Sequence, residues 1–365
     1  MNSNTDFSDI FRSRAADIRA CALRAGFGVN EMQIIERETA LAAADDELSA
    51  LFGESLVQRN SSQEIRVLAQ KNPLYNLIFL LAACRDVHDM YEKNGWTEEM
   101  FDGVLRDIRI WSEHCLANEL VFGISSGLCG ELSWLTAECA GGVLRFGRLQ
   151  CNTSCVFPDE RMILGRKNDP SWIVVMRQEY DLNERGLVAL DGERIAAHCP
   201  PMEETDDCFR GCAVRRDGSI DPVFRDFPKS EWEVLAKPGD FAINLHIPAD
   251  GPLSMEECRK SLDLMAGFFR KSGKDPKAFI CHSWILDPQF AGILPEKSNL
   301  NAFQRLGQVS TTPGVSEAWR RVFGFRLTPE TACHLPCPTG MQKAFLRFVQ
   351  NGGVFRNGSL SLPVR

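Results

Sequence analysis

The sequence lacks an excess of positive charge, and it lacks a long apolar run. Its 365 residues include 41 Lys and Arg against 49 Asp and Glu, a formal net charge of -8. Because nucleic-acid binding depends on cationic side chains that neutralise phosphates, we expect no nucleic-acid partner. The most apolar stretch, Leu74 to Cys84, is interrupted by Asn76 and falls far short of the roughly 20 residues that cross a bilayer. It predicts a buried helix and no membrane span.

Other signals are also missing. The N-terminus, Met1 to Phe7, has no cationic stretch followed by an apolar one, so we expect a cytoplasmic protein. In that compartment the 14 cysteines are expected to be reduced thiols without structural disulfides. The chain has no nucleophile elbow and no P-loop, which argues against a serine hydrolase and a P-loop nucleotidase.

The length and the pattern of apolar residues predict two domains. Up to residue 139 the apolar residues recur at helical spacing, for example Leu77, Leu80 and Leu81, and Thr97 is positioned to cap a further helix. From residue 140 onward the pattern changes to short strands such as 172–176. We therefore expect an all-helical domain at 1–139 and a mixed α/β or α+β domain at 140–365.

A strand and a helix are expected between residues 241 and 269. Residues 241–247 alternate, so that one face is apolar while the other presents Asn244 and His246. Proline and glycine then end the strand. Ser254 is expected to cap the following helix, with Glu257 completing a capping box.

A second strand is expected at 278–286. Phe279 and Cys281 lie on one of its faces, and Ile280 and His282 lie on the other. Asp287 is expected to cap a short helix that follows. This order of strand, helix, strand and helix is typical of an α/β core.

These segments together resemble a known family. The residues that carry the resemblance are Gly239-Asp240, Leu245-His246-Ile247-Pro248, Gly251-Pro252-Leu253, Cys258, Ser261, Phe268-Phe269, Cys281-His282-Ser283-Trp284 and Ser298-Asn299. The set is similar to bacterial acyltransferase-domain proteins, in which a helical N-acyltransferase N-terminal domain precedes a GNAT-like C-terminal domain.

The resemblance implies a sheet in which two neighbouring parallel strands separate and admit the pantetheine arm of an acyl-CoA or acetyl-CoA. Main-chain groups of an extended strand would then bind the pantetheine amides, and the amides at a helix N-terminus would face the pyrophosphate. The residues assigned to cofactor binding in this way are Leu245, Ile247, Pro248, Gly251, Leu253, Ser254 and Asn299.

The resemblance also implies transfer of the acyl group to an amine, on a small molecule or a peptide, by direct attack. That chemistry needs a base. His246 on the polar strand face is the first choice and His282 is the second. Cys281 is an alternative nucleophile, although His282 next to it points to the opposite face and Cys281 is more typical of a buried thiol.

Some features of acetyltransferases are absent. The Gln/Arg-x-x-Gly-x-Gly/Ala phosphate loop is replaced by residues 250–254, and the tyrosines are limited to Tyr75, Tyr91 and Tyr180. These absences favour, as an alternative, a binding or regulatory protein that keeps the fold without catalysis. Close cysteine pairs occur at 151/155, 208/212 and 333/337, but their spacing is not that of a zinc module, and no metal site is predicted.

Overall fold

The computed structural model describes residues 6–57, 72–126 and 131–364. The chain divides into two compact units, which are described separately. Met1–Phe146 and Pro248–Asp250 form the first unit, and Gly147–Ile247 and Gly251–Arg365 form the second. The predicted domain boundary after residue 139 stays a prediction. The change from helix to strand falls between Cys139 and Val143.

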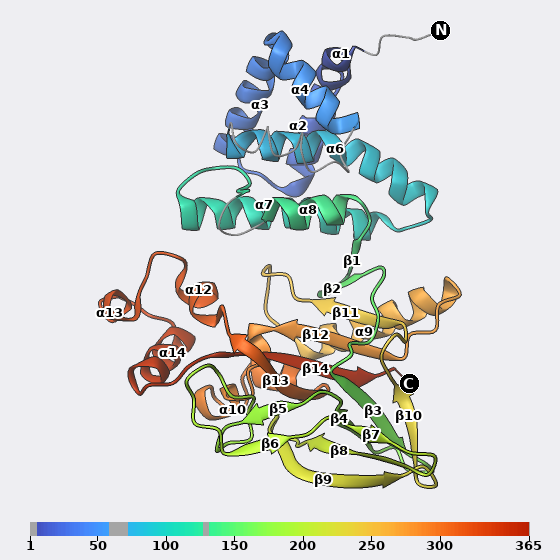
Figure 1. The fold of residues 1–365 in the computed structure, drawn as a ribbon. Helices are drawn as coiled ribbons and strands as arrows, with labels where there is room; N and C mark the ends of the chain where they lie inside the picture. The colour runs from blue at the N-terminus through green and yellow to red at the C-terminus, as the bar shows by residue number, and fades with distance from the viewer. Residues whose placement is uncertain (1–5, 58–71, 127–130, 365) are drawn as a thin grey trace. The chain divides into compact units, whose positions relative to one another are not determined.

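In the described residues the first unit is built of helices followed by one short strand (Figure 1). Thr97 caps its helix as predicted, because its side chain accepts a hydrogen bond from the Met100 amide. Asn72 caps the helix that begins at Pro73. Proline lacks a backbone N–H, but an N–H at the first helical position would have no acceptor within the helix. The elements are α1 Phe7–Arg12, α2 Ala15–Ala25, α3 Val29–Ala44, α4 Asp46–Val57, α6 Pro73–Lys93, α7 Glu98–Glu119, α8 Glu131–Cys139 and β1 Val143–Phe146.

The second unit combines strands with shorter helices (Figure 1). Its first half is β2 Leu149–Asn152, β3 Arg161–Arg166, β4 Trp172–Met176, β5 Tyr180–Leu182, β6 Ala197–Cys199, β7 Glu203–Glu204, β8 Cys208–Val214, β9 Ile220–Pro228 and β10 Trp232–Ala236. Its second half is β11 Ala242–His246, α9 Met255–Lys271, β12 Ala278–Ser283, η1 Trp284–Leu286, α10 Phe290–Ile293, α11 Asn299–Gln304, β13 Gln308–Val315, α12 Ala318–Phe323, α13 Pro329–Ala332, α14 Gly340–Gln350 and β14 Arg356–Pro363.

The sheet that carries the candidate site has the strand order β2-β11-β12-β14-β13 within this unit. β11 and β12 are parallel and the other neighbours are antiparallel. This mixed sheet with flanking helices, preceded by a helical region, confirms the predicted fold class. A second sheet has the order β10-β3-β4-β8-β7, with β9 paired to β8, and β5 pairs with β6.

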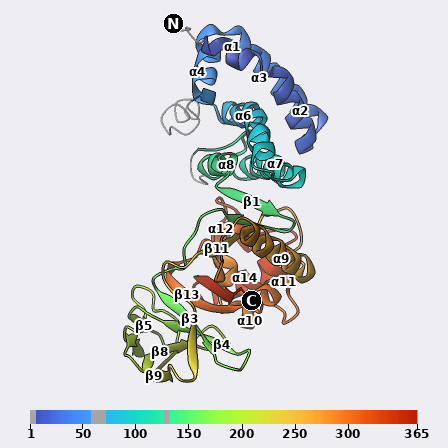
Figure 2. The same cartoon turned by 90° about the vertical axis from the view of Figure 1, so that its right-hand side faces the viewer.

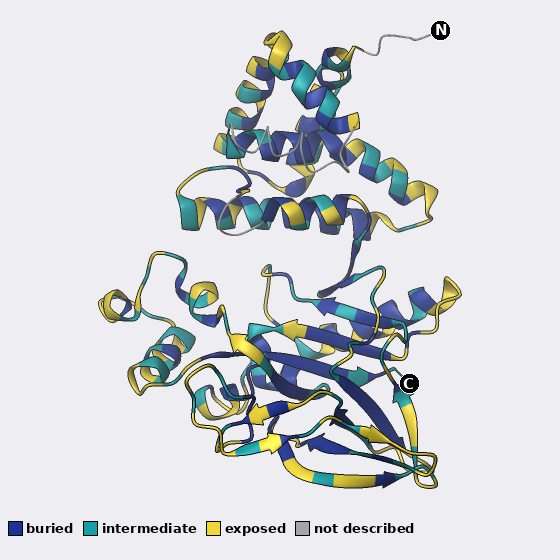
Figure 3. Cartoon of the chain, viewed as in Figure 1, coloured by how far each residue is buried: buried dark blue, intermediate teal, exposed yellow. Residues whose placement is uncertain are grey.

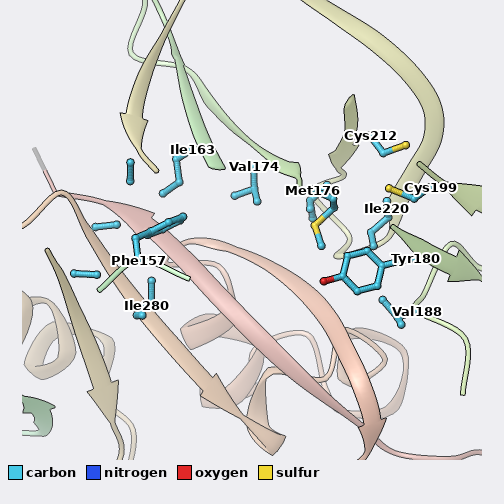
Figure 4. Packing of buried hydrophobic residues seen from close by; sticks show 14 of the residues in the cluster. Phe157, Ile163, Val174, Met176, Tyr180, Val188, Cys199, Cys212, Ile220 and Ile280 are labelled. Carbon is cyan, nitrogen blue, oxygen red and sulfur yellow. The ribbon is translucent and has the colours of Figure 1, made fainter. Parts of the chain in front are cut away.

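A shared apolar core joins the two larger sheets. Ile280 of β12 belongs to the same buried cluster as Ile163 of β3 and Val174 of β4 (Figure 4). On the other side, α9 packs on β2, and α11 packs against α9 (Figure 2). β12 and β14 are mostly buried, whereas much of β9 is exposed (Figure 3). The site strands are therefore held from both faces.

The structure corrects some local predictions. The strand predicted at 278–286 ends at Ser283 and continues as the 3-10 turn η1. α9 begins after Ser254 as expected, but the Ser254 side chain makes no capping hydrogen bond. The capping box is therefore wrong, because the Glu257 carboxylate pairs with Lys260 instead. The short helix α10 has Gln289 at its N-cap position without a side-chain capping bond, and the Asp287 carboxylate accepts a hydrogen bond from the Gln289 amide in the turn before it.

Gly358 explains why β12 ends early. It lies opposite Ser283 in the β12–β14 ladder, and a Cβ at this position would overlap the main-chain carbonyl of Leu286. The turn η1 therefore packs directly on the β14 backbone. By contrast, a Cβ at Gly267, within α9, would meet no atom within 4 Å.

We expect Gly358→Ala to lower the free energy of unfolding by about 3 kcal/mol, because the added methyl forces the backbone of η1 away from β14. Gly267→Ala is the matched control and should raise it by about 0.5–1 kcal/mol through helix propensity. Urea unfolding of both variants measures the difference. Equal stability of the two variants would contradict the close approach described here.

Candidate functional site

The two parallel strands β11 and β12 are paired over a short length and then separate. Their ladder joins Ala242 to Ala278, Ile243 to Phe279 and Asn244 to Ile280. Beyond Asn244, β11 continues paired with β2, through Leu245 and His246. Beyond Ile280, β12 continues paired with β14. The strands predicted to part in this way therefore do so after three pairs.

A polar cluster lies on β11 and β2 where the strands part. Asn244 and His246 are on one face of β11, since alternate residues of a strand point the same way. The Nδ2 of Asn244 donates to Oδ1 of Asn152 over 2.8 Å. The Nε2 of His246 lies 2.7 Å from the same oxygen. Asn152, the last residue of β2, therefore holds both side chains.

This contact assigns the tautomer of His246. An amide oxygen only accepts hydrogen bonds, so Nε2 of the imidazole carries the proton and Nδ1 carries the lone pair of the neutral ring. Burial lowers the pKa of His246 from its ordinary 6.5 to about 4. The imidazole is therefore neutral near pH 7, and it is a weaker base than an ordinary histidine.

His282, the second predicted base, is placed differently. It is an exposed residue of β12, beyond the last pair with β11, and its Nε2 lies 3.0 Å from the Thr312 hydroxyl. Burial of part of the ring, followed by the charge of Arg161, lowers the pKa of His282. The polar faces of β11 and β12 are the same face of the sheet, because Asn244 and Ile280 are register partners.

Cys281 is a buried thiol. Its side chain is 2% exposed, and burial raises its pKa to about 12. A nucleophilic cysteine requires the thiolate. The structure therefore favours the interpretation of Cys281 as a core residue over that of a nucleophile.

The chain that follows β11 contains most of the residues predicted to bind the cofactor. Leu245 and Leu253 are buried, Ile247 and Ser254 are half-buried, and Gly251 is exposed. Pro248 is buried and belongs to the first compact unit. Asn299 is the exposed first residue of α11, and the Ser298 side chain caps this helix.

Arg148 fixes the turn that leads into α9, and sequence reasoning did not identify it. Its guanidinium donates to the carbonyl oxygens of Pro252 and Gly251, each over 2.9 Å. Its backbone amide donates to the Ser261 hydroxyl over 3.0 Å. Arg148 thus adds positive charge beside the N-terminus of α9, where Glu256 is paired with Lys260.

Among the described residues, the group with metal-ligand geometry is His88, Asp89 and Glu92 on α6. The cysteine pairs at 151/155, 208/212 and 333/337 are not part of it. Its two carboxylates are exposed, and exposed acidic groups of this kind are common without an ion.

Two parallel strands of a mixed sheet that pair and then separate define a GNAT-like fold. Residues 143–360, more than half of the chain, match the family model for the GNAT-like C-terminal domain, and the chain belongs to this family. No curated protein sequence matches the chain. The helical region that precedes the domain is also present, as the resemblance implied.

Solved structures share the fold over nearly the whole chain. A crystal structure of an acyltransferase in complex with decanoyl-CoA and teicoplanin is 16% identical, with a TM-score of 0.60 over 95% of this chain and 88% of that one. A mutant acyltransferase in complex with octanoyl-CoA is 15% identical, with a TM-score of 0.60 and the same coverage of 95% and 88%. The likeness shows the fold. In the described part of this chain, no helix is long and apolar enough to span a membrane.

The lowered pKa of His246 gives a pH dependence of stability. Between about 4 and 6.5 the unfolded imidazole binds a proton and the folded one does not. The contribution of His246 is therefore complete above pH 6.5 and is lost as the pH falls toward about 4. We expect the unfolding free energy of wild type to fall more steeply over this range than that of His246→Gln. Urea unfolding at several pH values measures this free energy for both proteins. If the free energies of wild type and His246→Gln fall in parallel, a buried neutral imidazole is excluded.

Proposed function

We propose that the chain is an N-acyltransferase that moves an acyl group from acyl-CoA to an amine. The observation that carries this proposal is the separation of β11 and β12 after Asn244 and Ile280. An extended strand whose partner turns away is able to pair with another extended chain. The pantetheine arm carries amides that suit such pairing, and the thioester would then lie beside His246.

The arrangement on β11 supports direct transfer in a ternary complex. The acceptor amine attacks the thioester carbonyl, so that a C–N bond forms and the C–S bond breaks with the thiolate leaving. The proton of the amine moves to Nδ1 of His246, whose tautomer Asn152 maintains. His282 on the neighbouring strand is the second candidate for this role.

Main-chain groups of residues 245–254 are proposed to hold the donor, with Leu245, Ile247 and Pro248 along the pantetheine. The turn at Gly251, Leu253 and Ser254 would face the pyrophosphate, and Asn299 would contact the pantetheine arm. Arg148 supports this assignment because it places a cation at the turn and binds two of its carbonyls. Its charge compensates for the absence of the usual glycine-rich phosphate loop.

The acceptor is proposed to be an amine on a small molecule or a peptide. The solved acyltransferases of similar fold are described in complexes with CoA and 10C-teicoplanin and with decanoyl-CoA and teicoplanin. Those ligands belong to those proteins, and they suggest decanoyl-CoA and octanoyl-CoA as the first donors to test.

Calorimetry tests the donor site. We expect decanoyl-CoA to bind wild type, and Arg148→Met to bind it about tenfold more weakly, because a cation near the pyrophosphate is lost. Arg166→Met, which removes an exposed arginine of β3, is the control and should bind as wild type does. If no CoA thioester binds wild type at millimolar concentration, the transferase proposal is wrong.

The base is tested by acyl transfer, followed as release of free CoA with a panel of amines. His246→Ala should lower kcat by about 100-fold or more while decanoyl-CoA affinity changes little. Undiminished turnover by this variant would remove His246 from the mechanism. Loss of turnover in His282→Ala instead would assign the base to His282, whose Nε2 lies 3.0 Å from the Thr312 hydroxyl.

The alternative is a protein that binds acyl-CoA without transferring it. The specific observation in its favour is the absence of the acetyltransferase phosphate loop from the turn at 250–254. Tight binding of decanoyl-CoA by wild type, with no CoA released from any amine in the panel, would support this second function.

A further inference from the structure

Arg161 on β3 is a buried cation that forms a long ion pair with Glu160. Its side chain is 4% exposed. The guanidinium donates to the hydroxyls of Ser359 and Ser361 on β14, the second over 3.5 Å. The carboxylate of Glu160 lies 3.8 Å away, and in the described part of the chain the Nε of Arg161 has no hydrogen-bond partner.

The other deeply buried arginines are neutralised. Arg145, 5% exposed, forms ion pairs with Asp107 and Asp250. Arg356, 2% exposed, forms a hydrogen-bonded ion pair with Glu193. Removing a guanidinium from water costs several kcal/mol unless an anion compensates. Among the buried arginines of the described residues, Arg161 is therefore the one with the most distant carboxylate partner.

Arg161 also lies at the position where the site strands part. Ser361 is the register partner of Ile280, the last β12 residue that pairs with β11. Ser359 is the register partner of His282, two residues further along β12. The Ser359 hydroxyl donates to the carbonyl of Cys281 over 3.3 Å. Register partners have their side chains on the same face of a sheet. The guanidinium that contacts these serines therefore lies on the face that carries Asn244, His246 and His282.

We propose that Arg161, with Ser359 and Ser361, forms a subsite for a carboxylate of the acyl acceptor. A planar guanidinium with an unused N–H edge suits the two oxygens of a carboxylate. The exposed residue His282 is the register partner of Ser359, which Arg161 contacts, so the cluster adjoins an exposed part of the sheet face. The subsite selects amines that also carry a carboxylate, such as amino acids and peptides with a free C-terminus.

The identity of the ligand as acceptor rests on the proposed transfer reaction. In that reaction the pyrophosphate of the donor lies at residues 251–254, beyond the end of β11. The hydrogen bonds of Arg161 place it instead at Ser359 and Ser361 of β14, which are the register partners of His282 and Ile280. A carboxylate at Arg161 would then belong to the acceptor.

Binding is tested first, independently of turnover. The ¹H–¹⁵N NMR signal of the Arg161 Nε–H is assigned as the signal that is lost in Arg161→Lys, a variant that keeps the charge. We expect this signal to shift saturably with sodium hippurate, a carboxylate probe, and not with hippuramide, its neutral amide. An Arg161 signal unchanged by hippurate overturns the proposal, whether or not the protein transfers acyl groups.

Selectivity is tested next, with pairs of acceptors that differ only in the carboxylate, such as phenylalanine and phenylalaninamide. We expect wild type with decanoyl-CoA to prefer the acid by at least about tenfold in kcat/KM, the effect of one charge-assisted contact. Arg161→Met should abolish this preference, and Arg166→Met should keep it. A preference unchanged in Arg161→Met, or absent from wild type, overturns the assignment.

The outcomes separate the two proposals. A hippurate shift without any acyl transfer supports the anion subsite and contradicts the transferase function. Melting curves of Arg161→Met and Arg161→Lys establish that the variants fold. Compared with Arg161→Met, Arg161→Lys should recover part of the preference for the acid, because it keeps the positive charge but lacks the planar guanidinium.

Discussion

The arrangement of the candidate site depends on the end of the ladder between β11 and β12. Three register pairs join the strands, and each strand then follows a different neighbour. Because the ladder stops, β11 and β12 no longer pair with each other beyond Asn244 and Ile280, and the polar side chains of His246 and His282 lie beyond that point. We propose that the backbone beyond this point binds an extended ligand such as pantetheine.

The chemistry of the site follows from how the sheet surrounds the point where these strands separate. His246 is neutral because it is buried, and Asn152 fixes its proton on Nε2. Arg161 reaches the same face from the second sheet and contacts the serines of β14. A neutral base and a buried cation on one sheet face are suited to an acceptor that carries both an amine and a carboxylate. Family membership and the similar solved acyltransferases agree with this fold, while the transfer reaction rests on the geometry.

Much of the fold was predictable from the sequence because it depends on local patterns. Alternation of apolar and polar residues located β11 and placed Asn244 and His246 on one face, and Thr97 marked a helix start. Tertiary contacts decided the rest. Where β12 ends, Gly358 of β14 closely approaches η1. The Glu257 carboxylate forms an ion pair with Lys260 instead of capping its helix.

The contributions of Asn152, Arg148 and Arg161 had no signal in the sequence, because each depends on a partner far away along the chain. Asn152 meets His246 only through the pairing of β2 with β11, and Arg161 meets Ser359 only where the two sheets pack together. The predicted cofactor residues remain proposals, since their role concerns a ligand rather than a contact within the chain.

Amide hydrogen exchange, measured with and without CoA, tests the central claim most directly. The gap between β11 and β12 predicts that CoA slows exchange at residues 245–247 and in the turn at 251–254, while the paired amides of 242–244 change little. Slowed exchange elsewhere, with residues 245–247 unaffected, would contradict binding between the separated strands.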